Sequence, residues 1–302
     1  MNTRTLTIGT RGSKLALRQA HWVAERLRQA GNGVHIRVIK TTGDRAARIP
    51  LDSIGLQQGI KGVFTKEIED ALLAGAIDLA VHSLKDLPVD LDPRFVLGCV
   101  PQRADPRDAL LGAQLDGLRR GDRVATGSPR RAAQLRQLLP AVRVVDMRGN
   151  VDTRIRKLRE GVCQAIVLAV AGLERLGLKA EITQILDTYQ MVPAVGQGAL
   201  GIEVRHGDHA VLDAIAPLHD EVAAAEVEAE RALLRGFGGG CAVPLGANAT
   251  ATGGRLKLRA AVALDGDARI VRAEDSAPVI EAAVLGARVA ARLRGHRAES
   301  SG

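Results

Sequence analysis

The sequence predicts an α/β protein of two or three domains, and three observations lead to this prediction. The chain has 302 residues, which is more than one small core accommodates. From residue 5 to about residue 177, short apolar runs alternate with amphipathic segments across Gly, Ser or Thr turns. The last third contains a helical segment, three alternating runs and a final helical segment, which is the pattern of a small α+β domain.

The first strand and helix units occupy residues 5–84. A strand at 5–10 leads into a helix at 11–30, and Gly31 ends that helix. Apolar residues recur with helical spacing on one face, which we expect to be buried: Ala16, Ala20, Val23 and Leu27. The elements that follow are a strand at 34–40, a helix at 64–75 and a strand at 77–84 that ends in polar residues.

A second series of units follows residues 100–111, where Pro101, Pro106 and clustered charges predict a linker or hinge. Ser128 is expected to cap a helix that has Pro129 at its first position. Asn150 is expected to cap the next helix. The strand and helix pairs of this series are expected at 122–139, 142–161 and 164–177.

The last section begins with an Ala-rich helix at 221–236. Its three alternating runs predict strands at 242–251, 255–264 and 268–275, before a final helix at 278–293. The glycine-rich stretch at 196–201 matches GxGxxG, but a strand-like run follows it where a dinucleotide-binding helix would begin. We therefore interpret this stretch as a crossing between domains.

The composition points to a small anionic ligand. A formal net charge of +8 and a pI near 9.9 make an anionic partner plausible, and nucleic acid is the first to test. Aromatic residues make up only 2%, too few for the stacking platforms of single-strand binders. The sequence contains no apolar stretch of membrane length and no signal region, so we expect a cytoplasmic protein without a membrane or nucleic-acid partner.

The three cysteines have different surroundings. Cys99, Cys163 and Cys241 are too far apart in sequence for a disulfide framework or a CxxC metal cluster, and no HExxH spacing occurs, so no metal is expected. Cys99 and Cys163 lie in apolar runs and are expected to be buried. Cys241 follows three glycines and is the one cysteine expected to be exposed.

Basic residues recur where predicted strands turn into helices, at Arg11, Arg130, Arg131, Arg148 and Arg154, with Ser13 and Ser128 beside them. Helix N-termini bind anions through free N–H groups, and arginine adds bidentate capture of carboxylates. For a single arginine, a solvated helix end is the more common explanation. The same design at three turns favours a site for several anionic groups.

A polar segment with the sequence HSLKD ends the predicted strand at 77–84. Ligands of α/β proteins bind at such strand ends, and a carboxylate there can act as a general acid or base. Taken alone, Asp86 is equally well explained as a turn residue.

Six segments, in order, resemble the hydroxymethylbilane synthase family, also called porphobilinogen deaminase: VHSLKDLP, TGSPRR, RGNVDTRIRKL, LAVAGLERLG, PAVGQGALGIE and GGGCAVPLGA. The resemblance extends from about Ile8 to the final helix. It implies two α/β domains like those of type II periplasmic binding proteins, joined by hinge strands, and a small C-terminal α+β domain. The implied domains are 1–99 with 200–217, then 100–199, then 218–302, with hinges near 99–105 and 194–200.

The resemblance also implies a reaction. Four porphobilinogen molecules are joined head to tail with loss of ammonia, and water then releases hydroxymethylbilane. Cys241 would carry a dipyrromethane cofactor through a thioether, and glycines around it would let the sulfur approach a bulky group. Asp86 would stabilise the pyrrole-centred positive charge and handle the proton removed after attack. The family expectation is a monomer.

The remaining site residues follow from the same resemblance. Cofactor contacts are expected from Ser83, Lys85, Asp86, Ser128, Arg130 and Arg131. Substrate contacts are expected from Arg11, Ser13, Arg148, Arg154, Arg175 and Gln197. Lys61 and Phe64 match residues of the family's lid loop, although extra residues around 55–60 depart from the family pattern. We interpret Arg156 and Lys157 as part of a solvated helix face.

Two other functions remain open from the sequence. A two-domain anion-binding module without catalysis would share the α/β architecture, because fold alone does not decide function. A nucleic-acid-binding protein would rest on the net charge alone and would show steeply salt-dependent affinity. Cys241 on its glycine loop distinguishes the synthase, because a simple solute binder has no use for that thiol.

Overall fold

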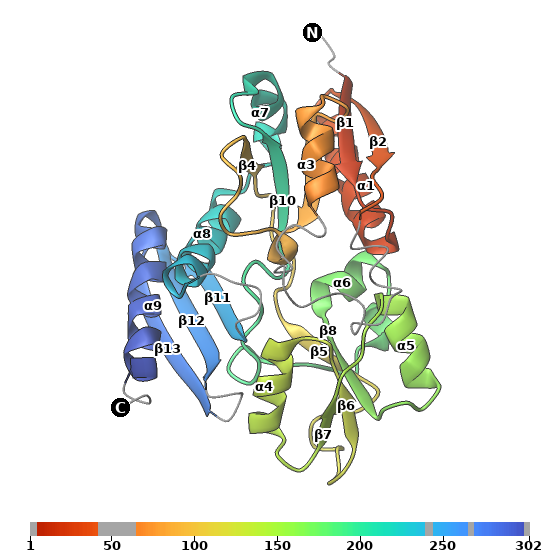
Figure 1. Cartoon of the computed structure of the whole chain (residues 1–302), viewed down its shortest axis with the longest axis vertical. Coiled ribbons are helices and arrows are strands. Elements are labelled where there is room, and N and C mark those ends of the chain that lie inside the picture. Colours follow the sequence, from red (N-terminus) through yellow and green to blue (C-terminus); the bar gives the residue numbers. More distant parts are fainter. Residues whose placement is uncertain (1–4, 42–64, 239–243, 265–268, 299–302) are drawn as a thin grey trace. The chain divides into compact units, whose positions relative to one another are not determined.

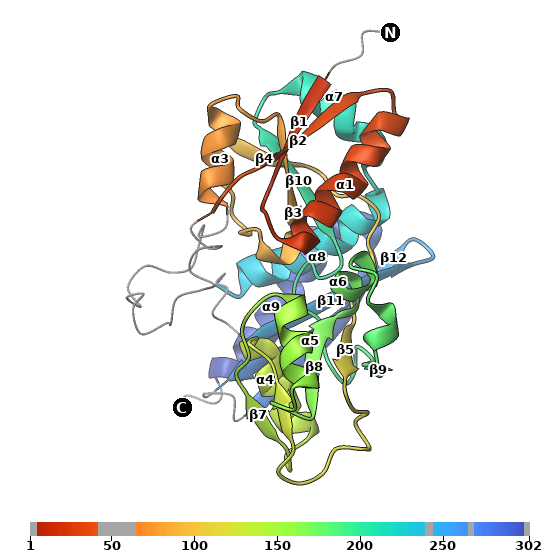
Figure 2. The ribbon, with the colours of Figure 1, turned by 90° about the vertical axis from the view of Figure 1, so that its right-hand side faces the viewer.

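The structure is a computed structural model of the whole chain, and it describes residues 5–41, 65–238, 244–264 and 269–298. By its internal contacts the chain divides into two compact units. The first contains Met1–Arg103 and Ala199–Ala224, and the second contains Ala104–Gly198 and Ala225–Gly302. Figure 1 labels most helices and strands of both units, and Figure 2 also labels β3 and β9.

The first unit contains a five-stranded mixed sheet with the order β2-β1-β3-β10-β4. Strand β1 is parallel to β2 and β3, whereas β10 is antiparallel to both β3 and β4. The strands are β1 (Thr5–Thr10), β2 (Gly33–Val38), β3 (Leu79–Ser83), β4 (Phe95–Cys99) and β10 (Leu200–Arg205). The run GIEVR at 201–205 therefore pairs with two strands that lie about a hundred residues earlier in the chain, β3 and β4.

Helices cover both faces of this sheet, and among the described residues they are α1 (Lys14–Gln29), α3 (Lys66–Leu73) and α7 (His209–Ile215). Figure 2 shows α1 and α3 on opposite sides of the strands. Leu79 and Val81 of β3 pack in one buried cluster with residues of α1, whereas Ala80 packs in another with Ile68 and Leu72 of α3. This alternation is the period of two that a strand with both faces buried requires.

The second unit contains another five-stranded mixed sheet, with the order β7-β6-β8-β5-β9. Its strands are β5 (Asp108–Leu111), β6 (Arg123–Ala125), β7 (Arg143–Val145), β8 (Ala165–Ala169) and β9 (Gln184–Ile185). Its helices are α4 (Pro129–Leu138), α5 (Val151–Arg159) and α6 (Val170–Arg175). The two sheets share one plan, in which three parallel strands are followed by a strand antiparallel to both its neighbours.

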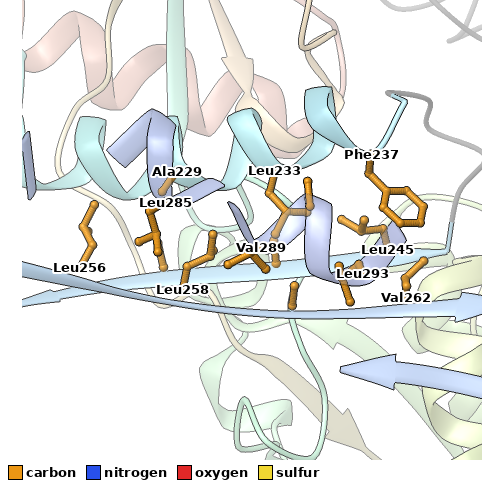
Figure 3. Packing of buried hydrophobic residues seen from close by; sticks show 14 of the residues in the cluster. Ala229, Leu233, Phe237, Leu245, Leu256, Leu258, Val262, Leu285, Val289 and Leu293 are labelled. Atoms are coloured by element: carbon orange, nitrogen blue, oxygen red, sulfur yellow. The ribbon is translucent and has the colours of Figure 1, made fainter. Parts of the chain in front are cut away.

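A third sheet in the second unit is an antiparallel meander of β11 (Leu245–Thr252), β12 (Arg255–Leu264) and β13 (Arg269–Pro278). Helices α8 (Glu221–Gly236) and α9 (Ala282–Ala298) pack on one face of it. Figure 3 shows Leu258 of β12 near Val289 of α9, and Val262 further along the same strand near Leu293 of α9. The α/β class and the additional small α+β part are therefore confirmed.

Several details differ from the sequence-based predictions. Ala16 is half-buried because it lies in the first turn of α1, and Gln19 and Ala24 are buried instead. The predicted linker at 100–111 contains a strand, since Asp108–Leu111 pairs with β8 and is fully buried. The final helix begins at Ala282 because β13 continues to Pro278 and a 3-10 turn follows it.

Candidate active site

The end of β3 presents two charged side chains to solvent on a short turn. Leu84–Asp86 forms a single 3-10 turn in which Lys85 and Asp86 are exposed. Leu84 and Leu87 are buried on either side of them. Gly201 of β10 lies directly against Leu84, because a Cβ at position 201 would be 2.6 Å from Leu84 Cδ1. The Asp86 side chain is thus exposed on a turn that is flanked by two buried leucines.

Other predicted residues lie at the same edge of the first sheet. Arg11 and Ser13 follow β1, which is parallel to β3 and adjacent to it, so the carboxyl ends of both strands meet at this edge. Ser13 caps α1, since its Oγ accepts a hydrogen bond of 3.2 Å from the Ala16 N–H. Ser83 Oγ accepts a 2.8 Å hydrogen bond from Gln19 Nε2 of α1. The first unit therefore brings Arg11, Ser13, Ser83 and Asp86 together.

In the second unit, Arg130 and Arg131 converge on a carboxylate that sequence reasoning missed. Asp108 Oδ2 lies 2.9 Å from Arg130 Nη1, and Asp108 Oδ1 lies 2.7 Å from Arg131 Nη2. All three side chains are buried. Burial raises the pKa of Asp108, but the two neighbouring guanidinium groups outweigh burial and hold that pKa well below its usual range.

These three side chains carry one net positive charge, because two cations face one carboxylate. Arg130 Nη1 also donates to the Val192 carbonyl at 2.6 Å, and Arg131 Nη1 donates to the Val167 carbonyl at 3.1 Å. Burial lowers the pKa of Arg130, and the attraction of Asp108 offsets that effect only in part. The structure therefore places both arginines in the interior of the unit, where their charge is only partly neutralised by Asp108.

Ser128 confirms its predicted local role at the start of α4. Its Oγ accepts a hydrogen bond of 3.4 Å from the Arg131 N–H, and Pro129 is the first residue of the helix. Asn150 occupies the corresponding position before α5, but in the described structure its side chain makes no capping hydrogen bond. The predicted helix starts are correct, and only the first of them is capped by its side chain.

The glycine-rich crossing is tied to the same network. Gln197 Nε2 donates to Asp108 Oδ1 at 2.8 Å and to the Pro106 carbonyl at 2.7 Å. Arg175 Nη2 donates to the Gly198 carbonyl at 2.7 Å, and burial lowers the pKa of Arg175 to about 10. Because β10 begins at Leu200, the GxGxxG match does not open a helix and is not a dinucleotide site.

Arg148 and Arg154 stand at the start of the α5 region with different exposure. Arg148 is exposed and lies 3.2 Å from an equally exposed Asp146. Arg154 is half-buried, and its Nε donates to the Gly149 carbonyl at 2.8 Å. Burial and the nearby charge of Arg131 lower the pKa of Arg154. A bound anion would relieve this excess of positive charge.

Three predicted residues, Lys61, Phe64 and Cys241, lie outside the described residues. The prediction for the other cysteines is confirmed, since Cys99 and Cys163 are buried. Among the described residues, no group of His, Cys, Asp or Glu side chains could hold a metal ion. Within those same ranges no helix is long and apolar enough to cross a membrane.

This chain resembles known proteins of one family over most of its length. Residues 6–213 match the family described as "Porphobilinogen deaminase, dipyromethane cofactor binding domain", and residues 224–295 match "Porphobilinogen deaminase, C-terminal domain". A porphobilinogen deaminase of Roseiflexus castenholzii is 51% identical over 295 residues, covering 96% of this chain and 95% of the relative. That of Syntrophobacter fumaroxidans is 46% identical over 273 residues, covering 88% and 87%.

A solved structure of a binding protein aligns with much of this chain at low sequence identity. The structure of an ancestral amino acid-binding protein, a precursor of cyclohexadienyl dehydratase, aligns with 71% of this chain and 87% of its own. Its sequence identity is 15% and the TM-score is 0.36.

Proposed function

The chain belongs to the porphobilinogen deaminase family. From this premise we propose which of its residues hold the cofactor, which bind the substrate and which takes part in the reaction. The reaction is a transfer in tetrapyrrole biosynthesis, in which four porphobilinogen molecules are condensed with loss of ammonia and released as hydroxymethylbilane. The observation that carries this assignment is the match of both family domains, which together span residues 6–213 and 224–295.

The described residues fit a dipyrromethane cofactor chemically. Each pyrrole ring of such a group carries an acetate and a propionate, so its site needs cations and hydrogen-bond donors. In the first unit, Lys85 offers an exposed ammonium group and Ser83 a hydroxyl. In the second unit, Ser128 lies at a helix N-terminus beside the partly neutralised charge of Arg130 and Arg131. We propose these residues as cofactor contacts and Cys241 as the thioether anchor.

When bound, the cofactor supplies the pyrrole to which substrate units are added. We propose that Asp86 is the reacting carboxylate of the chain. Its negative charge would stabilise the positive charge that develops on the substrate pyrrole as ammonia leaves. Its oxygen would then accept the proton that the attacking carbon loses. The support is its exposure on a turn that Leu84 and Leu87 hold in place.

We propose that substrate carboxylates are bound by Arg11, Ser13, Arg148, Arg154, Arg175 and Gln197. Among these residues, Arg148 is the most suited to direct contact, because its charge is exposed. Gln197 donates a hydrogen bond to Asp108. We propose that this bond fixes the orientation of the Gln197 side chain beside the ligand. Lys61 and Phe64 are proposed to belong to a lid over the substrate.

The finer organisation is also proposed. We propose three domains, at 1–99 with 200–217, at 100–199 and at 218–302, and the separate buried cluster of the third sheet supports the last of them. We further propose a cytoplasmic monomer without a membrane or nucleic-acid partner. The low aromatic content and the absence of an apolar stretch of membrane length in the sequence support this proposal.

The test is the intact mass of the denatured protein, measured beside a Cys241→Ser variant. We expect the wild-type protein to exceed its sequence mass by one dipyrromethane and the variant to show the bare mass. A Cys163→Ser variant is the matched control and should keep the extra mass, because Cys163 is buried. A bare wild-type mass that persists after incubation with porphobilinogen would contradict the proposal and favour an anion-binding module.

A further inference from the structure

A second polar pair lies inside the first unit, immediately before the turn that carries Asp86. His82 Nε2 lies 3.0 Å from Glu203 Oε2, and both side chains are buried. His82 is the fourth residue of β3 and Glu203 the fourth of β10. Register places Gly201 opposite His82 and Ala80 opposite Glu203, so the two side chains are diagonal neighbours on one face of the sheet.

This face is the one that α3 covers, since Ala80 packs there with Ile68 and Leu72. Glu69 of α3 is close enough for its pKa to respond to the pair. Burial raises the pKa of Glu69, the charge of Glu203 raises it further, and the charge of His82 lowers it. The polar pair therefore lies on the face of the sheet that α3 covers.

A fully buried carboxylate is costly unless a cation or hydrogen-bond donors compensate it. Glu203 is completely buried, and its Oε1 has no hydrogen-bond partner among the described residues. His82 satisfies the other oxygen. Well-packed apolar residues of similar size are often at least as stable as a buried ion pair, so stability alone does not account for this pair.

The neighbouring contacts show what the pair can do. On the opposite face, Ser83 is held by Gln19 of α1. In the plane of the sheet, the Leu84 N–H donates to the Ala199 carbonyl at 3.1 Å. His82 and Glu203 hold the same strand end from the α3 face, so the residues just before Asp86 are fixed from both faces and along the strand.

We propose that His82 and Glu203 are positioning residues, whose buried contact fixes the end of β3 so that the Asp86 carboxylate keeps its reactive place. This inference rests on the proposed role of Asp86. Small displacements of a reacting group slow a reaction, and a shift of about 1 Å can lower the rate roughly a hundredfold. The pair therefore acts on the rate of the reaction and leaves substrate binding to the arginines.

The test compares His82→Gln, Glu203→Gln and the double variant, all carrying the cofactor as shown by intact mass. We expect each single variant to lower kcat by roughly ten- to a hundredfold, with little change in KM. Amide hydrogen exchange in the peptide covering residues 83–87 should become faster. The double variant can form an uncharged amide pair, and we expect it to recover most of the lost kcat and the slow exchange.

Arg205→Gln is the matched control, because Arg205 ends the same strand and its Nη1 donates to the carbonyls of Leu72 and Ile77. It should lower stability and leave kcat and exchange at 83–87 unchanged. The inference is overturned if the single variants keep wild-type kcat and exchange, or if Arg205→Gln loses kcat equally. Glu203→Gln is nearly isosteric and decides the question if His82→Gln does not fold. Full activity of Asp86→Asn would instead refute the proposed role of Asp86.

Discussion

Arg131 Nη2 lies 2.7 Å from Asp108 Oδ1, and Arg130 Nη1 reaches the other oxygen of the same carboxylate at 2.9 Å. Removing this charge leaves two buried guanidinium groups without their carboxylate. We therefore expect Asp108→Asn to destabilise the protein by about 3–5 kcal/mol. Urea unfolding followed by circular dichroism measures the change. Asp146→Asn is the control and should cost at most about 1 kcal/mol, because its pair with Arg148 is exposed.

The same carboxylate predicts how stability depends on pH. The pKa of Asp108 in the folded protein lies well below the ordinary value of an aspartate, because the Arg130 and Arg131 guanidinium groups outweigh the effect of burial. A lowered pKa means that its stabilising contribution is complete above the unfolded value and is lost as pH falls through the folded value. Urea midpoints between pH 7 and pH 3 should therefore fall less steeply in Asp108→Asn than in the wild type. Parallel pH profiles would show that Asp108 does not contribute.

Asp86→Asn tests the reacting group. The amide keeps the size of the side chain but removes its charge and its ability to accept a proton, so we expect kcat to fall by roughly 10²–10⁴-fold. Folding should be unaffected because Asp86 is exposed. Steady-state kinetics with porphobilinogen give the result, and Asp90→Asn, another exposed acid nearby, should remain active. Equal activity of both variants would assign the chemistry to another group.

Arg148→Ala tests the proposed binding of substrate carboxylates. Losing an exposed, charged contact should raise KM or slow elongation by roughly ten- to a hundredfold, because a charged hydrogen bond contributes about 1.5–3 kcal/mol. Arg156→Ala is the matched control on the same region of the chain, since Arg156 is exposed and pairs with Glu160 at 2.7 Å. The ratio of kcat/KM between the two variants is the measurement. A ratio near one would place Arg148 outside the binding surface.

Local signals in the sequence predicted local structure well. Ser128 and Pro129 predict the start of α4 because an N-cap and a proline at the first position act within one turn. The alternation of strands and helices likewise predicts the α/β class. These features depend on neighbours in the chain.

Long-range pairings could not be found in the same way. Asp108 lies in the segment that the sequence predicts as a linker. Its role could not be predicted there, because its partners Arg131 and Gln197 are 23 and 89 residues away. His82 and Glu203 are separated by 121 residues and meet only because β10 returns to the first sheet. One signal was available, since an acid at the start of the apolar run DALL needs a buried cation, and arginines follow at 130 and 131.

The three cysteines allow a last prediction, which tests burial and the proposed anchor together. Burial raises the pKa of Cys99 to about 12 and also raises that of Cys163, so neither forms much of the reactive thiolate at pH 8. We expect iodoacetamide to leave the native Cys241→Ser variant unmodified and to add two groups after unfolding in urea, as intact mass would show. Wild-type protein with a thioether at Cys241 should also accept two groups after unfolding, whereas a free Cys241 would bring the total to three. Modification of Cys99 or Cys163 in the native protein would contradict their burial, and full labelling of N-acetylcysteine under the same conditions shows that the reagent is active.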